Sequence, residues 1–249
     1  MFVQVPANPG AGRPPFPCVT PAMFPEMRLR LRETGIEVTN LEFFRITSDV
    51  VVADYRAALE LGAELGAKRA VVHLHDTDEE RGLDRLSQFC ELAGGHGLAV
   101  GLEFNGLSAG CPSLARALEV VERAGCSNLG VGIDPLHLQR TGGKPADLLG
   151  VDRRLLSYAQ LCDGPVLADA GKALDPARYV ADVFDRLVPG EGSFPLAELV
   201  RALPADMPFD VEVPALRLIG TNISPRDHAR LAVMAARRLL MDHPGNDDA

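Results

Sequence analysis

Short apolar runs alternate with longer amphipathic runs along this chain, a pattern typical of strands that alternate with helices. Seven short runs are predicted strands: residues 2–5, 35–46, 70–74, 98–103, 129–134, 156–161 and 209–213. Seven longer runs repeat apolar residues at helical spacing: 25–34, 54–68, 78–95, 113–124, 176–187, 195–203 and 225–240. Strand–helix alternation at this spacing indicates parallel βαβ units.

The fold class predicted from this order is α/β, a TIM (β/α)8-type barrel that forms a single domain over residues 1–243. Residues 244–249 are polar and are expected to be a disordered tail. The count reaches seven strands, and the first lies almost at residue 1, so the barrel is expected to lack its first βα unit or the sequence to start late. A doubly wound open sheet is disfavoured because no Gly-rich phosphate loop follows an early strand.

Composition narrows the functional classes. The 249 residues carry a formal net charge of -9, which argues against a nucleic-acid partner because an acidic surface repels phosphates. Neither a membrane-spanning apolar run nor a signal-peptide pattern is visible, so we expect no membrane partner. The five cysteines are scattered without a C-x-x-C pair, as expected for reduced thiols in a cytoplasmic protein. The expected partner is a small molecule, and a homo-oligomer is compatible with the sequence.

Oxygen-bearing side chains stand at the C-terminal ends of the last four predicted strands: Glu103, Asp134, Gln160 and Glu212. In a parallel barrel these strand ends converge on one face, where active sites are built. One such carboxylate alone is more often a solvated loop residue or a helix N-cap, whereas four at one sheet end favour a shared role. Oxygen ligands suit hard divalent cations, so we predict a metal site for Mn²⁺ or Mg²⁺, with Co²⁺ or Zn²⁺ as alternatives.

Histidines near the predicted strand ends are further candidates. His137 follows Asp134 at a spacing of three, which favours a catalytic role over that of a buried core histidine. His73 and His75 both lie at the end of one predicted strand, and His75, nearer the end, is the candidate substrate-binding residue.

Glycine-rich segments supply the other substrate-binding candidates. Arg140 precedes Thr141-Gly142-Gly143, and Arg186 precedes a Pro-Gly-Glu-Gly segment that contains Glu191. Arginines in such loops suit a phosphate or carboxylate of a substrate, although an exposed turn is the ordinary alternative. Asp163, which follows Gln160 closely, is predicted to orient a ligand.

Five motifs together resemble the xylose isomerase-like TIM-barrel superfamily, specifically its sugar phosphate isomerase/epimerase branch. They are Leu102-Glu103-Phe104, Asp134-Pro135-Leu136-His137, Gln160-Leu161-Cys162-Asp163, Pro189-Gly190-Glu191-Gly192 and Val211-Glu212-Val213-Pro214. In that family the ligands follow the order Glu, Asp, His, Glu, which the resemblance maps onto Glu103, Asp134, Gln160 and Glu212. This chain departs from the family order at Gln160, where many members carry histidine. Glutamine at this position is a feature that the chain shares with members that resemble 3-dehydroshikimate dehydratases.

The resemblance implies carbonyl chemistry beside a metal, with Glu103 and Glu212 moving a proton as base and acid. Return of the proton gives isomerisation or epimerisation of a keto-sugar, sugar phosphate or related polyhydroxy carbonyl, which is the leading prediction. Loss of a β-hydroxyl instead gives a dehydratase of a 3-dehydroshikimate-like or keto-inositol-like substrate. An abasic-site endonuclease would need several histidine zinc ligands and a basic face, so it ranks below both, as does a non-catalytic barrel.

Overall fold

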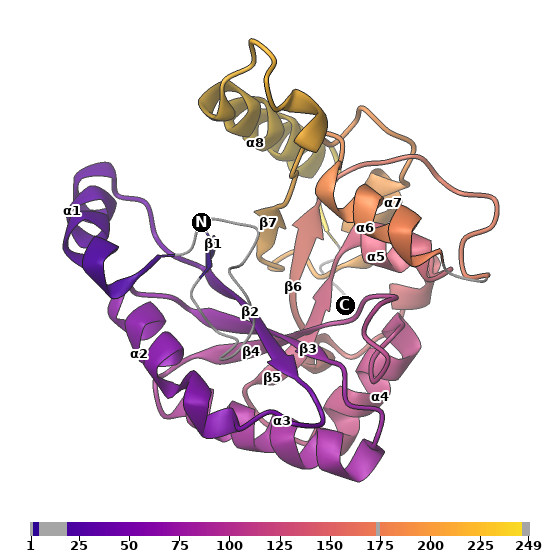
Figure 1. The fold of residues 1–249 in the computed structure, drawn as a ribbon. Helices are drawn as coiled ribbons and strands as arrows, with labels where there is room; N and C mark the ends of the chain where they lie inside the picture. The colour runs from indigo at the N-terminus through magenta and orange to yellow at the C-terminus, as the bar shows by residue number, and fades with distance from the viewer. Residues whose placement is uncertain (1, 5–18, 173–174, 246–249) are drawn as a thin grey trace. The chain divides into compact units, whose positions relative to one another are not determined.

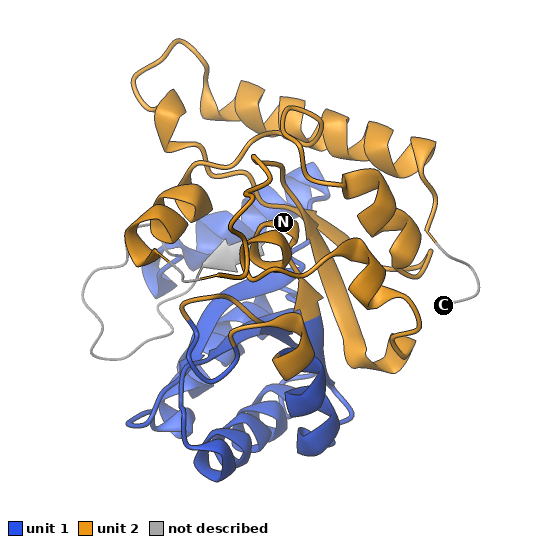
Figure 2. Ribbon diagram, turned by 90° about the vertical axis from the view of Figure 1, so that its right-hand side faces the viewer, with its two compact units in different colours: residues 1–103, 108–111, 117–131 blue, residues 104–107, 112–116, 132–249 orange. Residues whose placement is uncertain are grey.

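The computed structural model describes residues 2–4, 19–172 and 175–245, and these ranges form two compact units. The first unit comprises residues 1–103, 108–111 and 117–131, and the second comprises residues 104–107, 112–116 and 132–249 (Figure 2). The single domain predicted over residues 1–243 stays a prediction, and residues 246–249 of the predicted tail lie outside the described part of the chain.

Seven strands follow one another in chain order as hydrogen-bonded neighbours, in agreement with the seven predicted (Figure 1). They are β1 (Phe2–Gln4), β2 (Asn40–Ile46), β3 (Arg69–Leu74), β4 (Ala99–Glu103), β5 (Leu129–Ile133), β6 (Leu156–Leu161) and β7 (Phe209–Val211). The pairs β1–β2, β2–β3, β3–β4 and β6–β7 are parallel, as βαβ connections require.

Eight α-helices and five short 3-10 helices occur among the described residues. The α-helices are α1 (Phe24–Thr34), α2 (Arg56–Glu64), α3 (Glu79–Gly94), α4 (Leu114–Ala124), α5 (Pro135–Arg140), α6 (Pro176–Phe184), α7 (Leu196–Ala202) and α8 (Pro225–Asp242). The 3-10 helices are η1 (Pro21–Met23), η2 (Val52–Tyr55), η3 (Pro145–Leu148), η4 (Arg153–Leu155) and η5 (Leu216–Leu218). Within these ranges, no helix combines the length and the apolar character that a membrane crossing demands.

Helix α5 is the element that the hydrophobic pattern missed, because its six residues are too short to show helical periodicity. The local start signal was nonetheless present in the sequence. Asp134 is the N-cap and Pro135 takes the first helical position, where its missing N–H costs no intrahelical hydrogen bond. The expected loop after β5 is therefore a helix that fixes the backbone of both Asp134 and His137.

Apolar side chains of β2 pack against the two helices that follow it in the first unit. Phe44 is fully buried, and its ring centroid lies 5.2 Å from that of Tyr55 and 5.0 Å from that of Phe89 on α3. A Cβ atom on Gly62 of α2 would lie 2.1 Å from the Leu41 side chain, so helix and strand approach as closely as only glycine permits. This packing holds β2 against the helices, and the last residues of β2 and β3, Ile46 and Leu74, are also buried.

The core of the second unit lies between β6, β7 and the helices α7 and α8. Leu161, Val200 and Ala236 form its buried cluster, and Phe209 and Val211 of β7 pack against it. On β5, a Cβ atom at Gly132 would lie 2.5 Å from the Tyr158 ring of β6, so a larger residue there would displace that ring. The strands that carry the candidate residues are thus held by tight packing.

Candidate functional site

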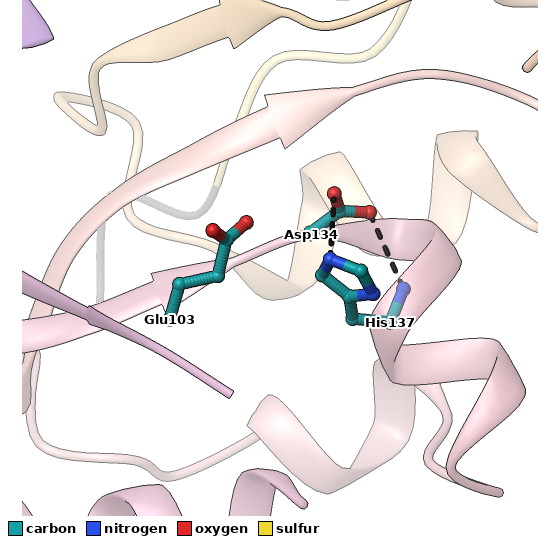
Figure 3. A group of neighbouring side chains, drawn as sticks. All are labelled: Glu103, Asp134 and His137. Carbon is teal, nitrogen blue, oxygen red and sulfur yellow. Dashed lines mark hydrogen bonds and ion pairs between the residues drawn. The ribbon is translucent and has the colours of Figure 1, made fainter. Parts of the chain in front are cut away.

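Asp134 is a fully buried carboxylate of the second unit. It is 0% exposed, and its Oδ1 accepts hydrogen bonds from the backbone N–H groups of Leu136 (2.6 Å) and His137 (3.3 Å). Its Oδ2 lies 3.8 Å from His137 Nε2 (Figure 3). Helix α5 therefore uses one carboxylate oxygen as its cap and leaves the other for the contacts of the site.

Arg186 reaches that second oxygen. Its Nη1 donates to Asp134 Oδ2 at 2.5 Å and lies 3.2 Å from Glu212 Oε2, and the whole residue is 2% exposed. Burial disfavours the charged guanidinium, but the two carboxylates outweigh it and raise the pKa of Arg186. Burial also opposes ionisation of Asp134, yet Arg186 and His137 lower the pKa of Asp134 below its ordinary value.

The sequence predicted that Arg186 binds a phosphate or carboxylate of the substrate, whereas in the structure it contacts carboxylates of the protein itself. Its guanidinium bridges two residues that were predicted as metal ligands, Asp134 and Glu212. The backbone N–H of Glu212 donates to the carbonyl of Leu161, which holds Glu212 at the end of β6. Binding of a substrate by Arg186 stays a prediction, and the structure adds an electrostatic link between two strand ends.

Gln160 on β6 provides the clearest sign of an unmet polar requirement. The residue is 1% exposed, and neither amide atom has a hydrogen-bond partner among the residues that the structure describes. Burying an amide without a partner costs roughly 1–3 kcal/mol in proteins. A cation or a substrate hydroxyl at this amide would supply the missing contact, so the donor set fits a bound metal or polyhydroxy compound.

Glu103 in the first unit is paired with a histidine that sequence reasoning passed over. Val72 of β3 pairs with Leu102 of β4, so the next residues, His73 and Glu103, stand side by side. His73 Nε2 lies 2.8 Å from Glu103 Oε2, and burial, with a smaller contribution from Arg45, lowers the pKa of His73 to about 3. His73 is therefore neutral near pH 7 and donates its Nε2–H to the carboxylate as a hydrogen bond rather than an ion pair.

The sequence favoured His75 over His73 as a site residue, whereas the structure shows His73 as the partner of Glu103. The two rings lie 6.1 Å apart between centroids, because residues two apart on a strand share a face. That periodicity was readable in the sequence and would have kept both histidines as candidates. Substrate binding by His75 stays a prediction.

Figure 3 draws Glu103, Asp134 and His137, three buried side chains whose types ligate metals. Glu103 is the last residue of β4, whereas Asp134 directly follows β5 and His137 lies on the first turn of α5. The structure thus puts each of the four predicted ligands at or near the carboxyl end of its strand. It also adds a residue that no sequence signal marked, Tyr179 of α6, whose hydroxyl lies 2.6 Å from His137 Nδ1.

Arg140 is held by the protein itself. Its Nε donates to Asp182 Oδ2 at 2.6 Å, its Nη1 donates to the carbonyl of Pro165 at 2.9 Å, and it lies over the Phe194 ring at 5.5 Å. These contacts explain how a guanidinium can be buried beside the Gly142-Gly143 turn. The substrate-binding role predicted for Arg140 stays a prediction.

Asp163 organises the loop that follows Arg186. Its Oδ1 accepts from the N–H groups of Gly164 (2.8 Å) and Phe194 (3.0 Å), and its Oδ2 accepts from Gly190 (2.9 Å). A Cβ atom on Gly192 would lie 2.3 Å from Oδ1, so the loop wraps tightly around this carboxylate. Glu191, predicted to bind substrate, is exposed on the same loop. The structure therefore gives Asp163 a role in loop architecture that its sequence position alone did not reveal.

Replacing Asp163 with alanine should destabilise the second unit by about 3 kcal/mol or more, because each orphaned buried donor costs roughly 1–3 kcal/mol. Urea denaturation followed by circular dichroism measures this change. Asp163→Asn retains one acceptor oxygen and should lose less. Equal stability of Asp163→Ala and the wild type would show that the loop does not depend on this carboxylate.

Comparisons with known proteins agree with this architecture. Residues 3–235 match the family described as xylose isomerase-like TIM barrel. Over 114 residues the chain is 30% identical to the 3-dehydroshikimate dehydratase of Pseudomonas aeruginosa. The matched segment is 46% of this chain but only 17% of that protein. The chain therefore spans about a sixth of the length of this relative.

Solved structures share the fold at lower sequence identity. A fusion protein of a xylose isomerase-like TIM barrel with 4-hydroxyphenylpyruvate dioxygenase has a TM-score of 0.71 at 21% identity, over 87% of this chain and 35% of that one. The IolI protein with a bound zinc atom has a TM-score of 0.73 at 17% identity, and the match covers 88% of this chain and 82% of IolI. D-psicose 3-epimerase from Clostridium cellulolyticum H10 has a TM-score of 0.66 at 15% identity, and the match covers 90% of this chain and 84% of the epimerase. Because the family match extends over most of the sequence, this chain belongs to the xylose isomerase-like TIM barrel family.

Proposed function

We propose that this protein is a divalent-metal-dependent isomerase or epimerase of a keto-sugar, sugar phosphate or related polyhydroxy carbonyl compound. The observation that carries the proposal is the series of oxygen side chains at the ends of four successive strands: Glu103, Asp134, Gln160 and Glu212. Neighbouring parallel strands end at the same edge of a sheet, so these groups are suited to one cation.

The chemistry of the donor set supports a divalent ion. Three carboxylates, the guanidinium of Arg186 and one divalent cation would sum to zero charge, which suits a buried site. The amide of Gln160 adds a hard oxygen and favours Mn²⁺ or Mg²⁺. Zn²⁺ and Co²⁺ remain alternatives, and the IolI neighbour was solved with a bound zinc atom. When bound, the cation would polarise a substrate carbonyl and acidify the adjacent C–H bond.

The side chains of this protein would then divide the proton transfer. Glu103, fixed by the N–H of His73, is oriented to act as one proton carrier. Glu212, whose side chain is 20% exposed and lies beside Arg186, would act as the other. His137 and Arg186 would contact substrate oxygens from the second unit, with Arg140, His75, Glu191 and Asp163 as further candidates near the substrate.

Dehydration is the second candidate function, because two observations favour it. The curated relative is a 3-dehydroshikimate dehydratase. The family resemblance also maps Gln160 onto the third ligand position, where it implies glutamine in members of the dehydratase type. The same initial proton removal followed by loss of a β-hydroxyl would give this lyase reaction. A reducing compartment such as the cytoplasm is the proposed setting for either enzyme, since Cys90, Cys111, Cys126 and Cys162 are free.

A product screen in deuterated water separates the two reactions. Purified protein loaded with Mn²⁺ would be incubated with keto-sugars, sugar phosphates and 3-dehydroshikimate, and products followed by NMR. Epimerisation or isomerisation should incorporate deuterium at the carbon beside the carbonyl without loss of water. A dehydrated, aromatic product would support the lyase instead. Failure of every substrate to react or exchange would contradict both enzymatic proposals.

A divalent cation should bind in a manner that depends on Gln160. Replacing Gln160 with leucine should weaken Mn²⁺ binding roughly tenfold, about 1.4 kcal/mol, because one oxygen ligand is lost. Isothermal titration calorimetry measures the affinity, and Gln88→Leu on the exposed face of α3 is the matched control. Equal Mn²⁺ affinities of the Gln160 and Gln88 variants would show that Gln160 is not a metal ligand.

A further inference from the structure

Arg45 is an exposed cation near the end of β2 in the first unit. Its guanidinium forms neither a hydrogen bond nor an ion pair with any residue that the structure describes. Arg140 and Arg186, by contrast, each pair with an aspartate of the second unit. The charge of Arg45 is therefore available to a ligand, whereas the charges of the two predicted anion-binding arginines are already matched by the protein.

The base and the side chain of Arg45 are both held in place. The buried Tyr55 hydroxyl donates to the Arg45 carbonyl at 2.6 Å, and the Arg45 backbone N–H donates to the Tyr55 oxygen at 3.3 Å. The guanidinium lies over the Phe43 ring, with its Cζ 5.5 Å from the ring centroid. These contacts orient the guanidinium and leave its N–H donors open, as a fork that matches two oxygens of a phosphate or carboxylate.

Arg45 stands in one row with two site residues on the neighbouring strands. Arg45 of β2 pairs with His73 of β3, and the register of β3 and β4 places His73 beside Glu103. The Phe43 ring stacks on the His73 ring at 4.5 Å between centroids, with 16° between their planes. Arg45, Phe43, His73 and Glu103 therefore share one face of the sheet. Arg45 and Glu103 are two strands apart, which is roughly 10 Å between their backbones.

The charges along this row determine how an anionic substrate would lie. A phosphate or carboxylate is repelled by the carboxylate of Glu103 and attracted by the guanidinium of Arg45. The whole chain carries a formal net charge of -9, so an anionic ligand depends on a local cation to bind. The row thus offers a proton carrier at Glu103 and an anion-binding group at Arg45, separated by about the length of a small polyhydroxy compound.

We propose that Arg45 binds the anionic group of the substrate, a phosphate or a carboxylate, while the reacting carbon lies at Glu103. This inference rests on the proposed function and narrows it, because it makes the substrates anionic polyhydroxy carbonyl compounds rather than neutral keto-sugars. Arg45 is then a residue that determines specificity, and Phe43 keeps its guanidinium oriented. Phosphate and carboxylate present the same pair of oxygens to a guanidinium, so the two sources are separated by experiment.

Two matched pairs of compounds test the proposal: fructose 6-phosphate against fructose, and 3-dehydroshikimate against its methyl ester. Full-length protein labelled with ¹⁵N-arginine is titrated with each compound at low ionic strength in the presence of a chelator. The Arg45 Nε–H signal is assigned by its loss in Arg45→Met. The charged member of one pair should shift this signal, and its neutral partner should not. A response in the first pair identifies phosphate and a response in the second identifies carboxylate. No response to either charged compound overturns the proposal.

Two variants and a control test the role of the charge. Arg45→Met keeps an apolar stem over Phe43, and it should raise the dissociation constant of the charged compound roughly 10- to 100-fold, as loss of a charged hydrogen bond does. Arg45→Lys keeps the charge without the planar fork and should lose less. Arg56→Met removes an exposed arginine of α2 in the same unit and should bind like the wild type. Calorimetry measures these affinities, and an unchanged preference for the charged compound in Arg45→Met overturns the proposal.

Turnover with Mn²⁺ separates this inference from the proposed reaction. Deuterium exchange is followed for all four compounds in the wild type and in Arg45→Met. A preference for a charged compound that is lost in Arg45→Met supports the inference. If a neutral compound reacts with the same kcat/KM as its charged partner, the inference is overturned while the proposed reaction stands. If no compound exchanges and the Arg45 signal still responds to a charged compound, the proposed reaction fails and the anion-binding role is supported.

Discussion

Replacing Glu212 with glutamine is expected to lower turnover by at least about a hundredfold, the lower range for loss of a general acid–base group. Glutamine has nearly the same size, and its amide oxygen can still accept from Arg186, which lies 3.2 Å from the Glu212 carboxylate. The amide cannot carry a proton at neutral pH. The variant should therefore fold normally and bind metal while failing at proton transfer.

Two measurements on the same samples make this prediction specific. Exchange of a substrate C–H proton with deuterated solvent should occur in the wild type and vanish in Glu212→Gln. Glu198→Gln on the exposed side of α7 is a matched control in the same unit and should exchange like the wild type. Wild-type turnover without solvent exchange would point to hydride transfer and would remove Glu212 as a proton carrier.

Replacing Asp134 with alanine should lower the free energy of unfolding by about 3–5 kcal/mol, because it leaves the guanidinium of Arg186 buried without its nearest counter-ion. Chemical denaturation in the presence of a chelator measures this loss separately from any metal effect. The double variant Asp134→Leu with Arg186→Met removes both charges and should recover most of the stability, since apolar replacements of a buried pair are often neutral.

The exposed pair of Arg154 and Asp152 is a matched control for that experiment. Its charged atoms lie 2.6 Å apart, but the arginine side chain is 88% exposed, so Arg154→Ala should leave stability unchanged within error. Equal effects of Asp134→Ala and Arg154→Ala would contradict a buried, stabilising charge pair.

Acid should weaken the same pair. The folded-state pKa of Asp134 is lower than its unfolded value, because Arg186 outweighs the effect of burial. The ionised Asp134 therefore contributes fully to the folding stability above its unfolded pKa of about 3.9. This contribution is lost as the pH falls through the lower folded-state pKa. The difference in stability between the wild type and Asp134→Ala should shrink over that acidic range.

Much of the candidate site was predictable because it depends on strand ends. An apolar strand that ends on a carboxylate or an amide marks a position near the edge of the sheet, and the order of the strands follows from their alternation with helices. That reasoning selected Glu103, Asp134, Gln160 and Glu212 as candidate ligands without any three-dimensional information. Strand and helix limits differ by a few residues, as at β2, which begins at Asn40 rather than at residue 35.

The support of the site was not predictable in the same way. His73 pairs with Glu103 through the register of β3 and β4, which a single sequence does not state. Tyr179 carried no signal in the sequence, because only the approach of α6 to α5 brings its hydroxyl to His137. The sequence marked Arg140 and Asp163 as candidate substrate-binding residues. In the structure, Arg140 donates a hydrogen bond to Asp182 of α6. Asp163 accepts a hydrogen bond from Gly190 in the loop after Arg186.

The sequence by itself determined the alternation of strands and helices, the family resemblance and the oxygen side chains at the strand ends, because each depends on local periodicity or on a short motif. The tertiary structure alone decided which charges meet. Arg186 reaches Asp134 and Glu212 across 52 residues and 26 residues of chain, and such long-range pairs are fixed by packing rather than by spacing. Those pairs set the protonation of the buried groups, which no local pattern of residues encodes.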